Sequence, residues 1–554
     1  MIDRSVFIAG AAGEGVQTVG DVVARAFQAH GYAVFASKEF ESRVRGGQSS
    51  YRLRISETPL NAPCGRADVL LAINPQAHAH YRDDLRDGGL VIASQSDDRA
   101  DIIVPFQDVA VEHGGKELFT NAAAAGALCA TLGLPFEPLE AALRAAFARH
   151  GEETAVANVA VATAGYDRAN AQRKSPRTPQ IPKRSTRYSL AATHEAIALA
   201  AAAAGCRFMA AYPMSPSTDI ITYLAKREDL GVFTEQAEDE IAAINMAVGA
   251  SAAGARAMTA TSGGGFALMV ETLSLAGMIE TPIVIVIAQR PGPATGLPTR
   301  TAQEDLLFAI HGGHGEFPRV VLAPSDPQDA MNKTIRAFDL ADRFQVPVLL
   351  LTDQFLADAM FSIDTLEIPA TQPPHITDPS AVPNEYARYA LTETGISPRL
   401  YFGQTEHPVV LDSDEHDEAG HLTEDLRFTR PAMVEKRLEK GRRVKQAMQP
   451  PLMNRCEDAE TVFIGWGSTC NVIEEAVARL RSGGAKVGSI HFGDLWPLPL
   501  FSFPEGARYW TVEGNATGQL AGLLTSEYGV PIAERIGRYD GLPIEAETIV
   551  KEWS

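Results

Sequence analysis

Strand-like apolar runs alternate with glycine turns and helical stretches along most of this chain. Near the N-terminus, residues 5–11 form an apolar run, Gly13 and Gly15 follow it, and a helix is predicted from Gln17 to His30. Later runs repeat the pattern: YAVFAS, SSYRLRI, ADVLLAI, GLVIAS and DIIVPF. This alternation is typical of sheets that are mainly parallel and covered by helices. The sequence therefore predicts a multidomain α/β protein.

Changes in composition divide the 554 residues into five parts. Residues 166–189 turn basic and proline-rich without apolar periodicity, which favours a solvated linker over a strand that docks a partner. The segment 368–455 is rich in Pro, His and Asp and contains the charged helix EKRLEKGRRVKQ. We expect α/β domains at 1–165, 190–367 and 456–554, joined by these two segments.

The net charge of −20 disfavours nucleic acid and anionic membrane surfaces as partners. The first residues lack the basic start and apolar stretch of a signal peptide, so we expect a cytoplasmic protein. The five cysteines lie far apart without a CxxC pair: Cys64, Cys129, Cys206, Cys456 and Cys470. This spacing predicts buried thiols, and no metal or iron–sulfur site on this chain.

Three strand-to-loop transitions fall within the second α/β domain. They are Ala210-Ala211 into YPMSPST, RAMTATS into GGGF, and PIVIVIAQ into RPGPATGLPT. Ligands bind at the carboxyl ends of strands in open parallel sheets. Pro213 and Pro216 restrict the backbone beside Ser215, although the loop's hydroxyls also suit ordinary turn and cap chemistry. We expect one site lined by the three loops.

Glu240 opens a helix whose next turns carry small apolar residues. The positions three, four, seven and eight residues later are Ala243, Ile244, Ala247 and Val248. Because these positions share one helix face, the Glu240 carboxylate should face packing and not water. A desolvated acid aimed into a loop-lined cleft suits proton sharing with a heteroaromatic nitrogen. The alternative is an acid that only stabilises the helix dipole.

Glycines and an arginine complete the predicted cleft. Gly263, Gly264 and Gly265 follow Ser262 and let a ligand approach the backbone closely. Arg290 leaves its strand at the carboxyl end, where a guanidinium could hold a substrate carboxylate or simply cap carbonyls.

Two other groups of residues look less like sites. The turn from Gly10 to Gly15 has the spacing GxxGxG and lacks an acidic ribose partner after the next strand, so a structural turn or a coenzyme A phosphate contact is favoured over a dinucleotide site. The acidic and histidine-rich stretch from Glu406 to His421 has no recognisable metal spacing, which favours a solvated loop.

Together these segments resemble the 2-oxoacid:ferredoxin oxidoreductases over nearly the whole chain. The segments IAGAAGEGVQTVG and SKEFESRVRGGQSSYRLRIS resemble a gamma-type domain. A pyrimidine-binding alpha domain is resembled by YPMSPST and EQAEDEIAAINMAVGASAAGARAMTATSGGG. A transketolase C-terminal-like domain is resembled by FIGWGS and AKVGSIHFGDLWPLP. A gamma domain fused ahead of alpha is most similar to the 2-oxoglutarate branch.

The resemblance implies roles for particular residues. Glu240 matches the glutamate on the cofactor's aminopyrimidine ring, Arg290 the substrate arginine, and Ser215 a substrate-loop threonine. The family's PSTG is PATG here, which removes one serine hydroxyl. Tyr212, Pro213, Ser262 and Gly263 are the further cofactor-binding candidates. Candidates for the substrate's distal carboxylate or coenzyme A are Lys38, Arg43, Arg45, Thr299 and Arg300.

The resemblance also implies an activity, the oxidative decarboxylation of 2-oxoglutarate with coenzyme A to succinyl-CoA and CO2, or the reverse CO2-fixing reaction. It further implies thiamine diphosphate as the cofactor and ferredoxin as the electron partner. Because Gly493-Asp494 is followed by Leu495, the chain has no GDG motif for Mg²⁺. We therefore expect a beta subunit to hold Mg²⁺ and a [4Fe-4S] cluster, in a dimer of alpha-beta heterodimers.

Three alternatives stay open at this point. The same chemistry could act on pyruvate or branched-chain 2-oxoacids. The chain could belong to a thiamine carboligase or decarboxylase that needs no ferredoxin, or be a scaffold subunit that has lost its site.

Overall fold

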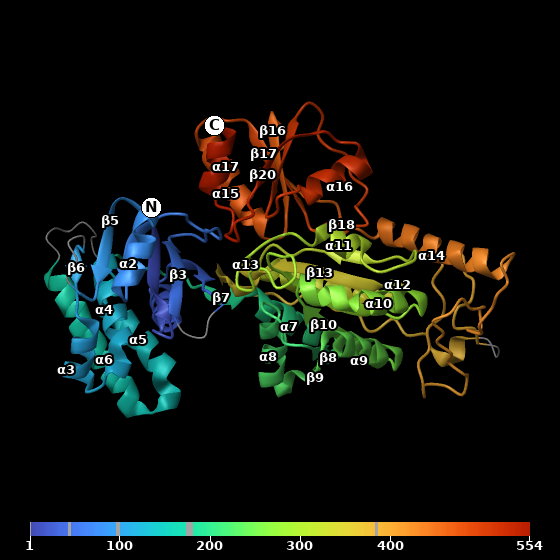
Figure 1. Cartoon of the computed structure of the whole chain (residues 1–554), viewed down its shortest axis with the longest axis horizontal. Helices are drawn as coiled ribbons and strands as arrows, with labels where there is room; N and C mark the ends of the chain where they lie inside the picture. The colour runs from blue at the N-terminus through green and yellow to red at the C-terminus, as the bar shows by residue number, and fades with distance from the viewer. Residues whose placement is uncertain (1, 43–45, 96–99, 173–180, 383–385) are drawn as a thin grey trace. The chain divides into compact units, whose positions relative to one another are not determined.

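The computed structural model describes residues 2–42, 46–95, 100–172, 181–382 and 386–554. The chain forms two units. Unit 1 consists of Met1–Ala191, Asp358–Thr365 and Glu545–Lys551, and unit 2 of Ala192–Ala357, Leu366–Ile544 and Glu552–Ser554. Both contain sheets covered by helices, so the predicted α/β class is confirmed (Figure 1).

An eight-stranded sheet in the order β6-β5-β4-β1-β3-β2-β14-β7 forms the centre of unit 1. The pairs β6–β5, β5–β4 and β4–β1 are parallel, whereas β1–β3, β3–β2 and β2–β14 are antiparallel. Only six residues connect β2 to β3, too few for the crossover that a parallel pair requires. The strands are β1 Asp3–Ala12, β2 Ala33–Glu39, β3 Gly46–Ser56, β4 Ala67–Ala72, β5 Leu85–Ala93, β6 Ile102–Ile103, β7 Ser189–Ala192 and β14 Met360–Ile363.

Glycines set the close packing of the helices of unit 1. A Cβ on Gly126 would lie 2.1 Å from the carbonyl oxygen of Ala162, and one on Gly165 would lie 2.3 Å from that of Ala123. The helices α4 and α6 therefore approach backbone to backbone. The helices are α1 Val16–Ala29, α2 Pro75–Tyr81, α3 Phe106–Gly114, α4 Thr120–Leu132, α5 Phe136–Phe147 and α6 Glu152–Ala171. Thus α6 continues to Ala171, beyond the start of the predicted linker.

Unit 2 contains a seven-stranded sheet in the order β18-β12-β13-β11-β10-β8-β9. All its pairs are parallel except β12 with β18. The strands are β8 Cys206–Ala211, β9 Phe233–Gln236, β10 Arg256–Thr261, β11 Ile283–Gln289, β12 Val320–Leu322, β13 Pro347–Asp353 and β18 Asp494–Trp496. The helices that follow them in the chain are α7 Thr193–Ala203, α8 Thr218–Lys226, α9 Glu240–Ala252, α10 Gly263–Met278, α11 Leu306–His311, α12 Pro327–Phe344 and α13 Gln354–Asp358.

The buried strand β11 contributes to two cores because successive side chains point to opposite faces of a sheet. Val284 and Val286 lie in a core with residues of α7, α8 and α12. Ile285 and Ile287 lie in a second core with residues of α9, α10 and α11. The sheet is therefore covered on both faces, as its continuous apolar strands predict.

A five-stranded sheet in the order β15-β17-β16-β19-β20 completes unit 2, and its residues Ile464 and Trp466 share the second core. Its strands are β15 Leu452–Asn454, β16 Thr461–Trp466, β17 Val487–Phe492, β19 Arg508–Glu513 and β20 Ile532–Gly537. The helices of this part of the chain are α14 Thr429–Gln446, α15 Cys470–Ser482, α16 Gln519–Tyr528 and α17 Ala546–Trp553.

The predicted charged helix is α14, and buried ion pairs attach it to the sheet domain. Lys436 and Lys440 both contact the carboxylate of Glu280, and all three side chains are at most 2% exposed. Burial alone would raise the pKa of Glu280, but the two ammonium groups and Arg388 hold that pKa well below its usual range. These buried ion pairs hold α14 against the sheet domain.

Thr193 is of a residue type that favours a helix N-cap, which predicts a cap at this position. The structure differs: Ala192 occupies the N-cap position of α7, and Thr193 is the first helical residue. The Thr193 hydroxyl has no hydrogen-bond partner within the described residues, because β7 runs directly into the helix without a turn in which the hydroxyl could fold back. Across the described ranges, we find no helix with the length and apolar character needed to cross a membrane.

Candidate functional site

Four neighbouring parallel strands of unit 2 end at one edge of the seven-stranded sheet. The strands β11, β10, β8 and β9 are adjacent, so the loops that follow them lie at the same edge. The three predicted loops follow β8, β10 and β11. Glu240 begins α9 four residues after β9 ends. The expectation that these loops adjoin one another is confirmed.

Glu240 lies buried at the first position of α9, with 4% of its surface exposed. The preceding Asp239 caps the helix by accepting a hydrogen bond from the Ala242 N–H at 2.7 Å. Asp239 thereby performs the helix-start role that would otherwise explain an acid here. The positive charge of Arg290 interacts with the Glu240 carboxylate. Because Asp239 already caps the helix, capping does not explain an acid buried at this position.

The three-glycine turn lies directly against Glu240. A Cβ on Gly265 would fall 2.7 Å from Oε1 of Glu240 and 2.0 Å from Oγ1 of Thr261. Only glycine allows the carboxylate this close to the start of α10. Ser262 is fully buried and donates its hydroxyl hydrogen to the sulfur of Met214 at 2.9 Å, which joins this turn to the YPMSPST loop.

Arg290 links the loop after β11 to the loop after β8. Its Nη1 donates to the carbonyl oxygen of Ser215 at 2.8 Å, and its exposed fraction is 9%. Burial lowers the pKa of Arg290, and the negative charge of nearby Glu240 partly offsets that effect. An arginine remains protonated at neutral pH. The geometry therefore brings the predicted acid and the predicted substrate arginine together.

The remaining predicted residues of the loop after β8 are more open. Ser215 and Tyr212 are exposed, the latter at 40%, and Pro213 is half-buried. Ser217 occupies the N-cap position of α8, but its hydroxyl donates to the carbonyl of Met214 and does not cap the helix. The loop thus presents the Ser215 side chain to solvent while its backbone is held by Arg290.

Asp305 is a second acid at the glycine turn, and sequence reasoning did not find it. A Cβ on Gly263 would lie 2.3 Å from its Oδ2, and this oxygen is sealed from solvent with no hydrogen-bond partner within the described ranges. Burial, with a smaller contribution from Glu304, raises the pKa of Asp305 to about 6. In the sequence it reads as an N-cap for α11, the position it occupies without a capping hydrogen bond.

Comparisons with known proteins agree with this geometry. The family described as "Pyruvate ferredoxin/flavodoxin oxidoreductase" matches residues 5–168, and "Pyruvate flavodoxin/ferredoxin oxidoreductase, thiamine diP-bdg" matches residues 199–436. The alpha subunit of 2-oxoacid:ferredoxin oxidoreductase 2 from Aeropyrum pernix is 31% identical, over 98% of this chain and 96% of its own length. The chain belongs to the alpha subunits of the 2-oxoacid:ferredoxin oxidoreductases.

Two further relatives of this oxidoreductase subunit carry 2-oxoglutarate in their names. The 2-oxoglutarate oxidoreductase subunit KorA of Mycobacterium tuberculosis is 30% identical, over 98% of this chain and 89% of its own length. A solved structure of 2-oxoglutarate:ferredoxin oxidoreductase from Magnetococcus marinus contains bound 2-oxoglutarate, coenzyme A and succinyl-CoA. Its sequence is 32% identical to this chain, and the two structures match with a TM-score of 0.93. The match covers 100% of this chain and 99% of that chain. Family membership favours an oxidoreductase over the carboligase alternative.

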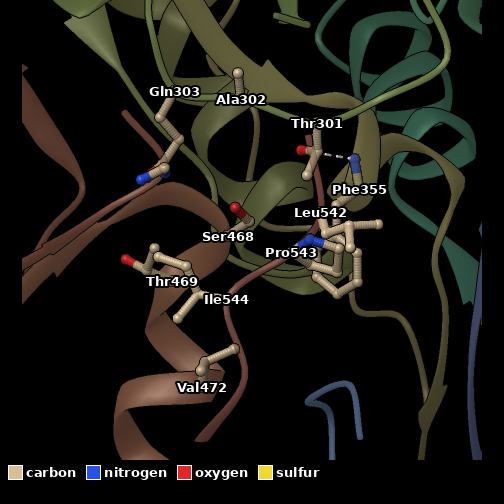
Figure 2. A pocket seen from close by; sticks show the side chains of 11 residues that line it. Thr301, Ala302, Gln303, Phe355, Ser468, Thr469, Val472, Leu542, Pro543 and Ile544 are labelled. Carbon is tan, nitrogen blue, oxygen red and sulfur yellow. Dashed lines mark hydrogen bonds between the residues drawn. The ribbon is translucent and has the colours of Figure 1, made fainter. Parts of the chain in front are cut away.

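The loop that carries Thr299 and Arg300 is fastened within unit 2 of the oxidoreductase subunit. The Thr301 N–H donates to the carbonyl of Gly541, and the Gln303 side chain donates to that of Trp466 at 2.9 Å. Figure 2 shows the cavity beside this loop, which has a volume of about 20 Å³. A water fits that volume but a substrate does not. The cavity is therefore a packing feature, and the ligand roles of Thr299 and Arg300 stay predictions.

The predicted ligand residues of unit 1 are only partly described. Lys38 lies half-buried in β2, whereas Arg43 and Arg45 lie outside the described residues. In the Gly10–Gly15 turn, Oε2 of Glu14 accepts from the Ala11 N–H at 2.7 Å and from the Asn74 amide at 2.6 Å. The chain's own Glu14 side chain thus fills this turn, which favours a structural turn over a phosphate contact.

The segment from Glu406 to His421 contains ordered contacts. His416 is buried and stacks near Tyr389 at a ring-centroid distance of 3.8 Å. In the described ranges, we find no group of three or more His, Cys, Asp or Glu side chains that could hold a metal ion. Within the described ranges the cysteines form no disulfide, and burial raises the pKa of Cys206 to about 12.

Proposed function

We propose that this subunit, together with a beta-type partner, catalyses oxidative decarboxylation of 2-oxoglutarate to succinyl-CoA and CO2, or the reverse CO2-fixing reaction. The carrying observation is the buried Glu240 carboxylate, which lies against the glycine turn and close to Arg290. The choice of 2-oxoglutarate is supported by the names of the Mycobacterium tuberculosis and Magnetococcus marinus proteins. The balanced reaction converts one 2-oxoglutarate and one coenzyme A into succinyl-CoA, CO2, a proton and two electrons, which reduce two ferredoxins.

The residues of the turn fit thiamine diphosphate. The matched family is described as thiamine diphosphate-binding over residues 199–436, which contain the turn. Gly265 lets the buried Glu240 carboxylate lie against the start of α10, where it could share a proton with a ring nitrogen. When bound, this cofactor supplies an electron sink for the bond that breaks as CO2 leaves. Glu240 would hold and move the proton on the pyrimidine ring nitrogen.

Arg290 would bind the substrate's carboxylate next to the 2-oxo group. One guanidinium nitrogen is already bonded to the Ser215 carbonyl, which fixes the plane of the group. The remaining N–H donors have a fork geometry that suits a carboxylate. The exposed Ser215 hydroxyl would donate to the same carboxylate. The missing serine of the PATG segment makes these two residues the main contributors to carboxylate binding in this loop cluster.

A partner subunit would supply what this chain lacks. The five cysteines are too far apart in sequence for a cluster motif, and the chain contains no GDG motif. Relatives are named as alpha subunits, so a multisubunit enzyme is the family's form. We therefore assign Mg²⁺, the diphosphate contacts and the [4Fe-4S] cluster to a beta subunit, in a dimer of alpha-beta heterodimers in the cytoplasm.

Pyruvate is the second candidate substrate, because the matched families are described by pyruvate oxidoreductases. The two substrates differ in the distal carboxylate, for which Arg300 and Lys38 are candidates in the described residues.

A substrate panel on the purified alpha-beta complex tests the proposal. We expect coenzyme A-dependent reduction of a viologen dye, with 2-oxoglutarate giving the highest kcat/KM among 2-oxoglutarate, pyruvate and branched-chain 2-oxoacids. A clearly higher value for pyruvate would overturn the substrate and leave the reaction class intact. Coenzyme A-independent carboligation without dye reduction would overturn the class.

The same assay on the isolated chain tests the assignment of the partner. With thiamine diphosphate, Mg²⁺, coenzyme A and 2-oxoglutarate added, this chain alone should reduce no dye. Activity of that preparation, or an iron–sulfur cluster bound to this chain, would contradict the assignment of Mg²⁺ and the cluster to a beta subunit.

A further inference from the structure

A cavity of about 540 Å³ lies in unit 2 beside α12, away from the glycine turn. None of its lining residues belongs to the candidate site described above. They come from α12, from the segment before and within β15, and from β17 and β18; the charged and polar ones are Asp329, Asn332, Lys333, Arg336, Gln449, His491 and Asp494. Its volume falls within the roughly 300–1,000 Å³ of small-molecule sites. We call it the α12 pocket.

The two basic residues of the α12 pocket differ in how many of their hydrogen-bond donors already have partners. Arg336 forms a bidentate pair with Asp494 at 2.6 and 2.7 Å and also donates to the Ala447 carbonyl at 2.9 Å. Lys333 contacts the Asp329 carboxylate through one of its three N–H donors. Arg336 is therefore committed to the fold, whereas Lys333 keeps donors for a ligand.

His491 is the unsatisfied group of the α12 pocket. Its exposed fraction is 5%, and neither ring nitrogen has a hydrogen-bond partner within the described part of the chain. Burial, followed by the charge of Lys333, lowers the pKa of His491 to about 3. The ring is therefore neutral, with one N–H donor and one acceptor. Leaving both buried without partners costs free energy that a bound polar ligand would recover.

Gly493 allows Lys333 to lie where it does. A Cβ at this position would fall 2.6 Å from both Cε and Nζ of Lys333. The glycine between His491 and Asp494 thus lets the ammonium group approach the backbone at the wall of the cavity. The prolines and leucine that complete the lining, Pro369, Pro450 and Leu452, provide apolar surface beside the polar end.

We propose that the α12 pocket binds a small organic molecule through a terminal oxyanion, a phosphate ester or a carboxylate, held by Lys333 and His491. Each acid of the cavity is already paired with a base, so the spare donors of Lys333 and the His491 N–H face an incoming anion. The side-chain amides of Asn332 and Gln449 can bind the polar part of the ligand, and the apolar wall its body. Because the charges of the lining balance, we expect Kd on the order of 0.1–1 mM.

Phenyl phosphate, benzoate and inorganic phosphate, titrated into the complete alpha-beta enzyme, test this proposal by calorimetry or ligand-observed NMR. We expect saturable binding of phenyl phosphate or benzoate, with the preferred one identifying the oxyanion, and weaker binding of inorganic phosphate because it lacks the apolar body. Lys333→Met should weaken binding at least tenfold, and His491→Phe should do the same while keeping a planar ring.

Lys226→Met is the matched control, because Lys226 is an exposed lysine near the end of α8. It should bind as the wild type does. If His491→Phe fails to fold, Lys333→Met decides the matter alone, with retained dye-reduction activity as the evidence of folding. The proposal is overturned if no probe binds saturably up to 10 mM, or if a folded Lys333→Met variant binds with unchanged affinity.

Discussion

Each unit of the molecule contains a glycine turn that leads from a strand into a helix, and the two turns differ in what fills them. In unit 1, the Glu14 carboxylate accepts two hydrogen bonds, and the Asn121 side chain occupies the space where a Cβ of Gly15 would lie. In unit 2, Glu240 and Asp305 lie against Gly265 and Gly263, and Oδ2 of Asp305 has no hydrogen-bond partner within the described residues.

The difference shows how to distinguish a structural turn from a ligand site. Both turns place backbone N–H groups at a helix start, which is the feature that attracts phosphate and other anions. In unit 1 the protein's own carboxylate already uses that feature. In unit 2 a buried oxygen of Asp305 beside the turn has no partner within the described residues, at a cost that burial makes large. Unmet hydrogen-bonding capacity, more than glycine spacing, indicates a site.

The largest expected effect is on catalysis. Glu240→Gln should keep the fold and reduce dye-reduction activity of the complex by about 10²–10⁴-fold, because an amide cannot exchange the proton. Glu238→Gln, at an exposed position two residues earlier, is the control and should retain activity. Near wild-type turnover of Glu240→Gln would contradict a catalytic role for the glycine turn of unit 2.

A methyl group in the open turn should also be poorly tolerated. Gly265→Ala places a Cβ 2.0 Å from Oγ1 of Thr261, so we expect a loss of about 2–3 kcal/mol of stability together with lost activity. Gly249→Ala in α9 is the matched control, since no atom lies within 4 Å of its Cβ and alanine favours helix. Equal urea-unfolding midpoints of the two variants would contradict the close approach.

The second acid should make stability depend on pH. The pKa of Asp305 is raised to about 6 in the folded chain, against 3.8 for the ordinary group. Between these values the unfolded chain releases the proton while the folded chain keeps it, so stability falls as pH rises and stays lower above pH 6. Asp305→Asn should lack this fall, so its free energy of unfolding relative to the wild type should rise by about 2–3 kcal/mol between pH 4 and pH 7.5.

Urea unfolding of the wild type and Asp305→Asn at both pH values measures this difference directly, because all other titrating groups are shared. Parallel pH profiles for the two proteins would show that the Asp305 carboxyl is not desolvated at the turn.

The smallest effect on stability is expected in the glycine turn of unit 1. Glu14→Ala removes the acceptor for the Ala11 N–H and the Asn74 amide, and should cost about 1 kcal/mol of stability. Glu117→Ala, an exposed acid in the same unit, should change the unfolding midpoint little. If Glu14→Ala were as stable as that control, the turn of unit 1 would not depend on its own carboxylate.

Much of this architecture could be predicted from hydrophobic periodicity and strand ends. The strand runs of both units, the burial of Glu240 and the meeting of the loops after β8, β10 and β11 all follow from local patterns and the rule that parallel strands end at one edge. The long similar segments identified the family before the fold was known, and the comparisons confirmed it.

Features that depend on distant partners could not be predicted in the same way. Asp305 reads as a helix cap, and only the fold shows that its carboxylate lies against Gly263. The partners of Glu14 include Asn74, 60 residues away, so the sequence could not show that the turn of unit 1 is filled. Likewise, the unpaired nitrogens of His491 depend on packing around a strand that otherwise looks ordinary.

Solvent exchange of the cofactor's reactive thiazolium proton tests the central claim most directly, because it reports on Glu240 without substrate turnover. The alpha-beta complex would be loaded with thiamine diphosphate, mixed with D2O, quenched at short times and analysed by NMR. The account predicts that Glu240→Gln slows this exchange by about 10²–10⁴-fold while Glu238→Gln leaves it unchanged. Equal exchange rates in Glu240→Gln and the wild type, with the cofactor bound in both, would contradict it.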